Sequence, residues 1–244
     1  MIQRLLRILL VLTFGFFCPA ESLRAQREPA APWHLLYTQI RDGFISKQEA
    51  QFRLTSLEVK LKDLYLKHSN RKEEGSLCFP LEGYTRSAIG GKNGSGYQAQ
   101  GYDFFDGNRH KGHPGHDIFI RDKDQDGIDD STGKSVNVIS ASSGIIVSVK
   151  SDWEPSSPIR GGNYIWIYEP IKSRYYYYAH FKEIFVEIGQ TVSRGVRIGT
   201  VGRTGKNAYP KRSPTHLHFA VYDSIGEYPM PVDPYRELVK GSSG

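Results

Sequence analysis

The chain has 244 residues, of which 39% are hydrophobic and 24% charged, and its formal net charge at pH 7 is +6. This composition excludes a disordered chain and suits one sizeable domain with an extension. The 25 glycines and 15 tyrosines, with many short β-prone runs, favour a β-dominated core.

The first 25 residues have the form of a secretory signal. Two arginines form a basic region, an apolar run follows over residues 8–17, and small residues stand at Ala20 and Ala25. The apolar run is too short to span a membrane. We expect cleavage after Ala25, with Ala20 as the second choice, and an exported mature chain in the periplasm, the cell envelope or the medium. Cys18 leaves a lipoprotein anchor as an alternative, although bulky residues precede it.

Removal of residues 1–25 takes away three arginines and one glutamate, so the net charge falls from +6 to +4. A modest positive charge would favour an anionic polymer such as a cell wall, but it can also serve solubility alone. Cleavage also leaves Cys78 as the only cysteine. A disulfide within the chain and a cysteine-rich zinc knuckle are then excluded, and a metal site must use histidine and carboxylate.

Residues 26–76 are predicted to form a helical extension with linkers at 26–32 and 70–76. A short helix is expected over residues 33–41. A longer helix follows the capping box at 46–49, Ser-Lys-Gln-Glu. Its apolar residues recur at spacings of three and four and form one stripe: Ala50, Leu54, Leu57, Leu61 and Leu64. Two helices do not make a core, so this hairpin must lie on the main domain or on a partner.

Residues 77–240 are predicted to form one mainly β domain. Glycine and proline separate the short runs that are candidates for strands, namely 135–139, 144–150, 164–168, 175–181 and 216–222. A helical pattern appears in this part of the chain only near its end, over residues 234–238.

His216 and His218 lie two residues apart inside an apolar, β-prone run. Side chains alternate along a strand, so both imidazoles are predicted to share one face. His113 and Asp117, four residues apart, also share a face if their segment is extended. Two histidines from one strand and a histidine with a carboxylate from another can close around one zinc ion.

A hydrolytic zinc site keeps three protein ligands and leaves a fourth position for water, whose pKa it lowers to roughly 7. We expect His113, Asp117 and His218 to be the three ligands. His216 would stand beside the metal as a proton acceptor or as a hydrogen-bond donor to developing negative charge. These residues predict metal-dependent hydrolysis.

His180 follows four consecutive tyrosines, residues 175–178, and Ala179. If this run is one extended strand, Tyr176, Tyr178 and His180 face one side and the alternate residues face the other. Such a strand suits the wall of a groove on one face and packing on the other.

Together these motifs resemble the lysostaphin/LytM-type zinc metallopeptidases, which include the β-lytic peptidoglycan endopeptidases. The resemblance runs from about residue 79 to 235, and its segments follow the family's order: 113–118, 143–147, 162–167, 178–181, 188–192, 199–205 and 216–219.

The resemblance implies an antiparallel β-sheet groove that encloses a zinc ion. His113, Asp117 and His218 match the family's zinc ligands, and His180 and His216 match two catalytic histidines that orient the water and stabilise the tetrahedral intermediate. The implied reaction is hydrolysis of peptide bonds in peptidoglycan stem peptides or cross-bridges by metal-activated water. The D-alanine to diaminopimelate cross-link and glycine bridges are candidate bonds, and no nucleic-acid partner or membrane span of the mature chain is expected.

One departure from the family pattern lies just before His113. Residues 106–112 lack the tyrosine that often assists the oxyanion in the family, and Tyr102 is the nearest one. His110 and His116 are additional histidines. His116 is out of phase with the expected carboxylate ligand in a strand, so we rank it below His113.

A second departure is an acidic insertion over residues 121–130. Three of its aspartates resemble the oxygen ligands that begin a calcium loop: Asp122, Asp124 and Asp126. Position twelve of such a loop should be a glutamate, but it is Gly133 here, which leaves Asp129 or Asp130 in its place. A solvated acidic turn is the alternative to a structural calcium site.

Two alternatives to a peptidoglycan endopeptidase remain open. One is a non-catalytic module of the same fold that binds the wall or activates another hydrolase, and the other is a zinc peptidase that acts on proteins. The non-catalytic module usually shows lost ligands, and none is lost here. The helical hairpin is a candidate for a partner-binding arm or for an autoinhibitory cover over the groove.

Overall fold

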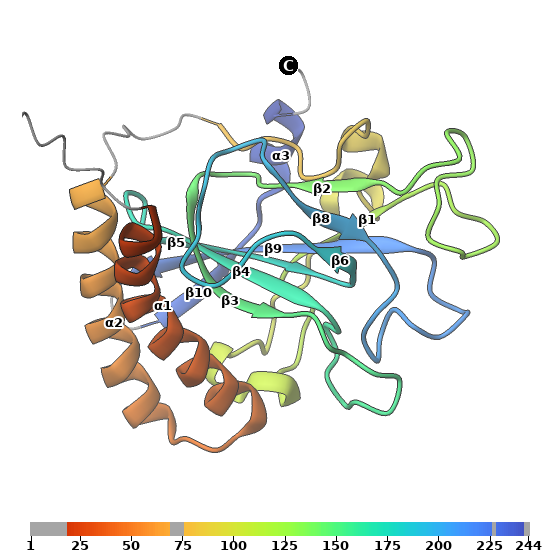
Figure 1. Cartoon of the computed structure of the whole chain (residues 1–244). Helices are drawn as coiled ribbons and strands as arrows, with labels where there is room; N and C mark the ends of the chain where they lie inside the picture. Colours follow the sequence, from red (N-terminus) through yellow and green to blue (C-terminus); the bar gives the residue numbers. More distant parts are fainter. Residues whose placement is uncertain (1–18, 69–75, 226–227, 242–244) are drawn as a thin grey trace, which may run out of the picture.

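The two helices nearest the N-terminus lie side by side at one side of the protein, against the β-sheets (Figure 1). The computed structural model describes residues 19–68, 76–225 and 228–241. Its helices are α1 (Pro19–Asp42), α2 (Lys47–His68) and α3 (Tyr235–Gly241), and its 3₁₀ turns are Arg86–Ala88, Lys92–Gly94 and Phe104–Arg109. The predicted class, mainly antiparallel β after an α-helical hairpin, is confirmed.

Two antiparallel sheets form the β part. The larger sheet has the strand order β1-β9-β5-β4-β3-β7, and β10 pairs with β9 as well. Its strands are β1 (His116–Phe119), β9 (His216–Ile225), β5 (Arg174–Ala179), β4 (Tyr164–Glu169), β3 (Gly144–Lys150), β7 (Thr191–Val192) and β10 (Tyr228–Val232). The smaller sheet has the order β2-β8-β6, with β2 (Asn137–Ile139), β8 (Arg197–Val201) and β6 (Phe181–Ile184).

The larger sheet is buried on both faces, which is why β4 is buried at every residue. One face packs with the smaller sheet in a first core, whose members include Ile165, Tyr176, Tyr178, Ile198, Leu217 and Phe219. The other face packs against the helical hairpin of α1 and α2 in a second core, whose members include Trp33, Leu36, Leu61, Trp166, Tyr175 and Tyr222. The hairpin therefore lies on the main domain, which was one of the two placements expected.

Each of the five predicted strand segments overlaps a strand, namely β2, β3, β4, β5 and β9. The helical pattern near the end lies in α3. Strand β1 lies at the end of the extended segment that was expected to carry Asp117. The strands that the sequence did not indicate, β6, β7, β8 and β10, are two to five residues long. Runs this short do not show a period, and β10 also contains two prolines, which suit only the edge of a sheet.

The prediction of a linker over residues 26–32 is wrong, because α1 runs through it with Pro29 and Pro32 inside the helix. A proline inside a helix removes a backbone donor and normally breaks the helix. Here Pro29 and Ala30 are buried, and Ala30 belongs to the second core. Tertiary packing thus outweighs the poor helix propensity of the segment.

The turn between the two helices follows the expected local chemistry. Gly43 takes a positive φ of 75°, donates to the carbonyl of Ile40 and is followed by a bond from Phe44 to the carbonyl of Gln39. This is the Schellman arrangement that ends a helix. The Ser46 hydroxyl then accepts the backbone N–H of Glu49 at 3.2 Å, as the capping box predicts.

Within the described ranges, the chain contains no helix long and apolar enough to cross a membrane. Residues 1–18, which hold most of the predicted signal, lie outside the described residues. The expected cleavage after Ala25 stays a prediction.

A half-buried carboxylate, that of Glu58, ties α2 to the sheet. Glu58 accepts hydrogen bonds from the hydroxyls of Tyr175 at 2.7 Å and Ser224 at 2.5 Å. Burial raises the pKa of Glu58 above its ordinary 4.5, and the two hydrogen bonds offset only part of this effect. The folded protein therefore binds the Glu58 proton more tightly than the unfolded chain, and the free energy of unfolding falls as the pH rises from about 4.5 through the folded pKa.

We expect Glu58→Gln to raise the melting temperature at pH 7, because it removes a partly desolvated charge and keeps an acceptor oxygen. The gain should shrink towards pH 4, where the carboxyl is protonated. Thermal unfolding at both pH values checks this, with the exposed Glu154→Gln as the control. A glutamine variant that melts lower at pH 7 would contradict the cost assigned to the charge.

Trp33 connects the hairpin to the sheet. It is 1% exposed, its ring lies 5.3 Å from that of Tyr175 and 5.9 Å from that of Trp166, and its indole N–H donates to the Tyr175 hydroxyl. We expect Trp33→Ala to lower the free energy of unfolding by about 3–5 kcal/mol in urea titration. The change Phe52→Ala, on an α2 residue that is 74% exposed, should cost less than about 0.5 kcal/mol. If Trp33→Ala and Phe52→Ala lowered the free energy of unfolding equally, the hairpin would not be part of the core.

Candidate metal centre

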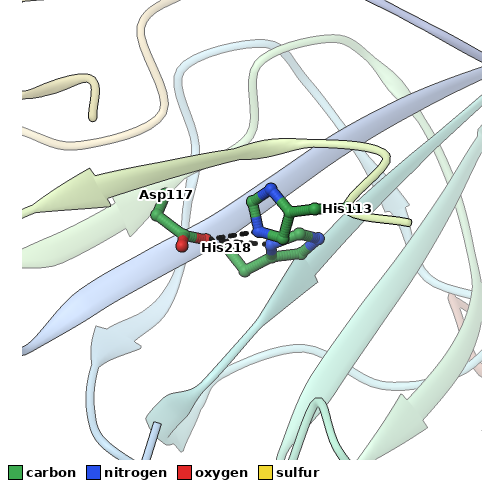
Figure 2. Close-up of side chains that lie close together, drawn as sticks. All are labelled: His113, Asp117 and His218. Carbon is green, nitrogen blue, oxygen red and sulfur yellow. Dashed lines mark hydrogen bonds and ion pairs between the residues drawn. The ribbon is translucent and has the colours of Figure 1, made fainter. Parts of the chain in front are cut away.

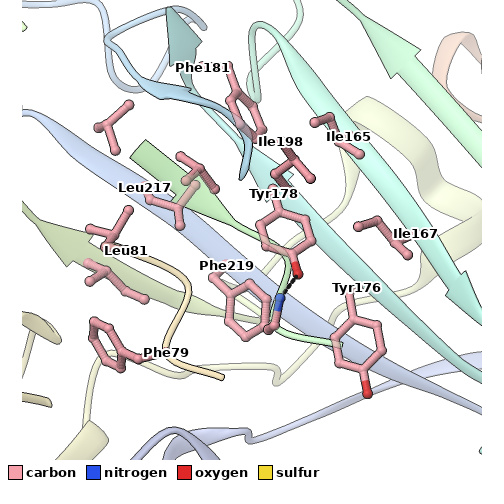
Figure 3. Packing of buried hydrophobic residues seen from close by; sticks show 14 of the residues in the cluster. Phe79, Leu81, Ile165, Ile167, Tyr176, Tyr178, Phe181, Ile198, Leu217 and Phe219 are labelled. Carbon is pink, nitrogen blue, oxygen red and sulfur yellow. Dashed lines mark hydrogen bonds between the residues drawn. The ribbon is translucent and has the colours of Figure 1, made fainter. Parts of the chain in front are cut away.

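Strand β9 carries the two histidines of the His-x-His motif on one face. His216 and His218 alternate with Leu217 and Phe219, which point into the first core (Figure 3). On the neighbouring strand β1, Asp117 is paired directly with His218 across the antiparallel ladder. The pairing places the carboxylate beside the imidazole, because directly opposite residues in a ladder share a face.

His113 reaches the same place through a turn before β1. Its backbone pairs with Gln98, and its Nδ1–H donates to the carbonyl of Gly96 at 2.9 Å, so Nε2 faces the site. Gly115 makes the approach possible, because an added Cβ would lie 2.6 Å from the carbonyl oxygen of Phe219. A larger residue there would push the turn away from β9.

The three predicted ligands meet around one carboxylate oxygen (Figure 2). Asp117 Oδ1 lies 3.1 Å from His113 Nε2 and 3.0 Å from His218 Nδ1. Burial would raise the pKa of Asp117, but the contacts with the neighbouring histidines outweigh it and hold that pKa well below its usual range. The carboxyl is therefore ionised, as a metal ligand must be.

These donors fit a zinc ion. All three ligand atoms lie within 4.8 Å of one another. Tetrahedral zinc with bonds of 2.0–2.1 Å holds its ligand atoms about 3.3 Å apart, close to the separations around Asp117. Two imidazole nitrogens and one carboxylate oxygen are also the donor types of hydrolytic zinc sites. The structure thus brings together the residues expected to hold the metal.

His180 reaches the cluster by a backbone reversal. The predicted strand 175–181 is interrupted, because β5 ends at Ala179 and His180 takes a positive φ of 72°. The prediction that His180 shares a face with Tyr176 and Tyr178 is therefore wrong. Its ring lines the same cavity as His218, and the two ring centroids are 6.1 Å apart. Positive φ is rare for a residue other than glycine and often marks a functional position.

The two predicted catalytic histidines have matching orientations. His180 Nδ1 lies 2.7 Å from the carbonyl of Thr204, and His216 Nδ1 lies 2.7 Å from that of Pro214. Each Nδ1–H donates to its carbonyl, so each Nε2 carries the lone pair. The ring centroids are 4.8 Å apart, and His216 Nε2 lies 3.6 Å from the Asp117 carboxylate. Burial and the neighbouring histidines lower the pKa of His180, which keeps it neutral and able to accept a proton.

A cavity of about 180 Å³ lies beside the cluster and is lined by all five residues of the zinc hypothesis. Its aromatic wall comes from the sheet face, from α1 and from the segment at the start of the 3₁₀ turn Phe104–Arg109: Tyr37, Tyr102, Phe104, Tyr164, Trp166, Tyr177 and Tyr222. Tyr102 is held there against Tyr222, with ring centroids 5.6 Å apart. No sequence pattern marked Tyr37, Arg41 or Arg160 as cavity residues, because their segments come together only in the folded chain.

The two additional histidines have different places. His116 is fully buried and its Nε2 lies 2.8 Å from an Asp233 oxygen, away from the cavity, as its phase in the strand predicts. His110 lines the cavity, and its ring lies 4.8 Å from that of Tyr102. Burial lowers the pKa of His110 to about 4, so it is neutral at physiological pH.

The acidic insertion groups its side chains differently from the calcium-loop prediction. Asp122, Asp124 and Asp130 come together, whereas Asp126 accepts the backbone N–H of Ile128. Asp126 therefore lies outside the cluster, because a tight turn within the segment uses its carboxylate. The Asp122 carboxylate accepts two backbone N–H groups and the Thr215 hydroxyl. Calcium binding stays a prediction.

The chain matches peptidase family M23 over residues 123–234. The match includes His180, His216 and His218. It begins after His113 and Asp117. The resemblance to the lysostaphin/LytM-type metallopeptidases is thereby confirmed. No curated protein matches the chain.

Several solved structures are similar. A zinc-containing peptidase from Vibrio cholerae is 25% identical over 66% of this chain and 40% of its own, with a TM-score of 0.43. The catalytic domain of the antimicrobial peptidase lysostaphin from Staphylococcus simulans is 28% identical over 55% and 80%, with a TM-score of 0.37. A Ruminococcus gnavus protein provisionally named glycyl-glycine endopeptidase LytM is 21% identical over 91% and 86%, with a TM-score of 0.45. The chain spans 40% of the length of the Vibrio protein.

We expect the purified protein to bind about one zinc ion per chain. His113→Ala and His218→Ala should each abolish this binding, because two remaining ligands do not hold a hydrolytic zinc site. Atomic emission and calorimetry with zinc measure the stoichiometry. His110→Asn, in the same cavity but outside the cluster, is the matched control. Zinc retained in His113→Ala and lost in His110→Asn would overturn the ligand assignment.

Proposed function

We propose that this chain, with its peptidase family M23 match over residues 123–234, is an exported zinc metalloendopeptidase acting on the stem peptides or cross-bridges of peptidoglycan. One observation carries the proposal. Three ligand-type side chains lie within 4.8 Å of one another, and two further histidines with free Nε2 atoms line the same cavity. A fold without catalytic demand has no physical need for this arrangement.

His113, Asp117 and His218 would hold the ion. A zinc ion bound there supplies Lewis-acid activation of water and of the scissile carbonyl. The neighbouring histidines keep the carboxyl of Asp117 ionised, and the Gly96 carbonyl fixes the tautomer of His113. Because the three side chains already lie within 4.8 Å of one another, binding of one ion would need no rearrangement of the backbone.

His180 and His216 would move the proton and stabilise charge. Their Nδ1–H groups are held by backbone carbonyls, so only Nε2 of each ring is available to the substrate. One neutral Nε2 can accept the proton of the attacking water, and a protonated one can donate to the developing oxyanion. The positive φ of His180 and the short Pro214 contact fix both rings before substrate arrives.

Two further features support the site of action. The signal-like N-terminus supports export, and the net charge of +4 without residues 1–25 suits an anionic polymer. The hairpin contributes Trp33 to the second core and Tyr37 to the cavity wall. We therefore propose that it completes the site, and that its removal destabilises the domain.

The test compares muropeptide release from purified sacculi by the mature chain and its variants. We expect His180→Ala and His216→Ala to bind zinc normally but to cleave about 10²–10⁴-fold more slowly. His218→Ala should lose both zinc and cleavage, and His110→Asn should keep both.

The outcomes distinguish a peptidoglycan endopeptidase from a peptidase that acts on proteins and from a non-catalytic module. Zinc bound by a wild-type chain that cleaves proteins but leaves sacculi intact would replace the wall substrate with a protein one. A wild-type chain that binds no zinc and cleaves nothing would support the alternative function, a non-catalytic module of the same fold. Full activity in His180→Ala would overturn its role in proton transfer.

A further inference from the structure

Two guanidinium groups line the cavity, Arg41 from α1 and Arg160 from the loop between β3 and β4. The cavity lining contains one carboxylate, that of Asp117, which we expect to be a zinc ligand. The cavity therefore has an excess of positive charge, and the two arginines decide where an anionic group of a substrate would bind.

Arg41 is already committed to partners within the protein. Its Nε and Nη2 donate to the two carboxylate oxygens of Asp42 at 2.7 and 2.6 Å, and its Nη1 donates to the Tyr164 hydroxyl at 2.9 Å. A bidentate carboxylate neutralises the guanidinium. Arg41 is thus a poor candidate for a substrate anion.

Arg160 differs from Arg41 in this respect. Its Nη1 donates one hydrogen bond to the carbonyl of His110 at 2.8 Å, and its backbone N–H donates to the Asn108 side chain at 3.1 Å. In the described part of the chain, no carboxylate pairs with this guanidinium. The side chain is half-buried, and it keeps donors free beside the metal cluster.

The loop holds Arg160 in place. Gly161 follows it, and a Cβ there would lie 2.0 Å from the hydroxyl of Tyr177. Asn108 in turn donates to the carbonyl of Pro158 at 3.0 Å. The guanidinium is therefore anchored by one carbonyl and by a tight backbone, which lowers the entropy lost when it binds a ligand.

We propose that Arg160 is a specificity-determining residue that binds a free carboxylate of the substrate next to the scissile bond. The planar fork of a guanidinium matches a carboxylate and discriminates strongly against a neutral amide. The inference rests on the proposed function and narrows it. The favoured substrate carries a free carboxylate on the carbon attached to the scissile nitrogen, as diaminopimelate does in a D-alanine cross-link. A glycine bridge carries none.

The test measures binding, so that it does not depend on turnover. The probes are D-alanyl-diaminopimelate with that carboxylate free and the same compound with it amidated. Calorimetry uses the zinc-loaded chain with His180→Ala, which keeps the probes intact. We expect the free acid to bind about tenfold more tightly than the amide. The ratio should fall to about one when Arg160→Gln is added.

Arg194→Gln is the matched control. Arg194 also donates one guanidinium hydrogen bond to a backbone carbonyl, that of Ser76 at 2.7 Å, but it lies outside the cavity. This variant should keep the tenfold ratio. If Arg160→Gln does not fold, Arg160→Lys replaces it, and a reduced ratio is expected because the fork is lost.

Equal binding of the two probes, a ratio that persists in Arg160→Gln, or no binding of either probe at millimolar concentration would overturn the assignment. A tenfold preference that depends on Arg160, in a wild-type chain that hydrolyses neither probe nor sacculi, would instead support the carboxylate site and reject the endopeptidase.

Discussion

The site depends on one antiparallel pairing, that of β1 with β9. Its register sets Asp117 opposite His218 and Phe119 opposite His216. A shift of one residue would turn the histidines into the first core and expose Leu217 to the cavity, since side chains alternate with period two. The apolar residues between the histidines prevent this shift, so the same alternation that fills the core also assembles the ligands.

On the other face of the sheet, the hairpin of α1 and α2 likewise contributes both to the core and to the site. Trp33 packs on Tyr175 and Trp166, while Tyr37, one helical turn later, lines the cavity. One helix therefore contributes both to the stability of the domain and to the wall of the site. The half-buried Glu58 carboxylate reinforces the contact at the cost of a partly desolvated charge.

The sequence patterns predicted the features that depend on interactions between residues close together in the chain. The His-x-His run, the strand cores and the capping box at Ser46 depend on neighbours in the sequence, and all appear in the structure. Two errors arose where the backbone departs from the regular pattern, at the helix through Pro29 and at the positive φ of His180. Arg160 could not be recognised from the sequence, because only the folded chain shows that its guanidinium lines the cavity and pairs with no carboxylate among the described residues.

The acidic insertion contributes no residue to the proposed zinc site, but it stabilises the strand that carries two of the site's histidines. Asp122 is 6% exposed, and its carboxylate accepts the Thr215 hydroxyl at 2.6 Å, directly before His216. Arg203 donates to the same hydroxyl at 3.0 Å and to the carbonyl of Ser213 at 2.8 Å. The start of β9 is thus fixed by a charge-assisted network, which is stronger than neutral hydrogen bonds. The insertion therefore positions His216, because the strand that carries it begins at this anchor.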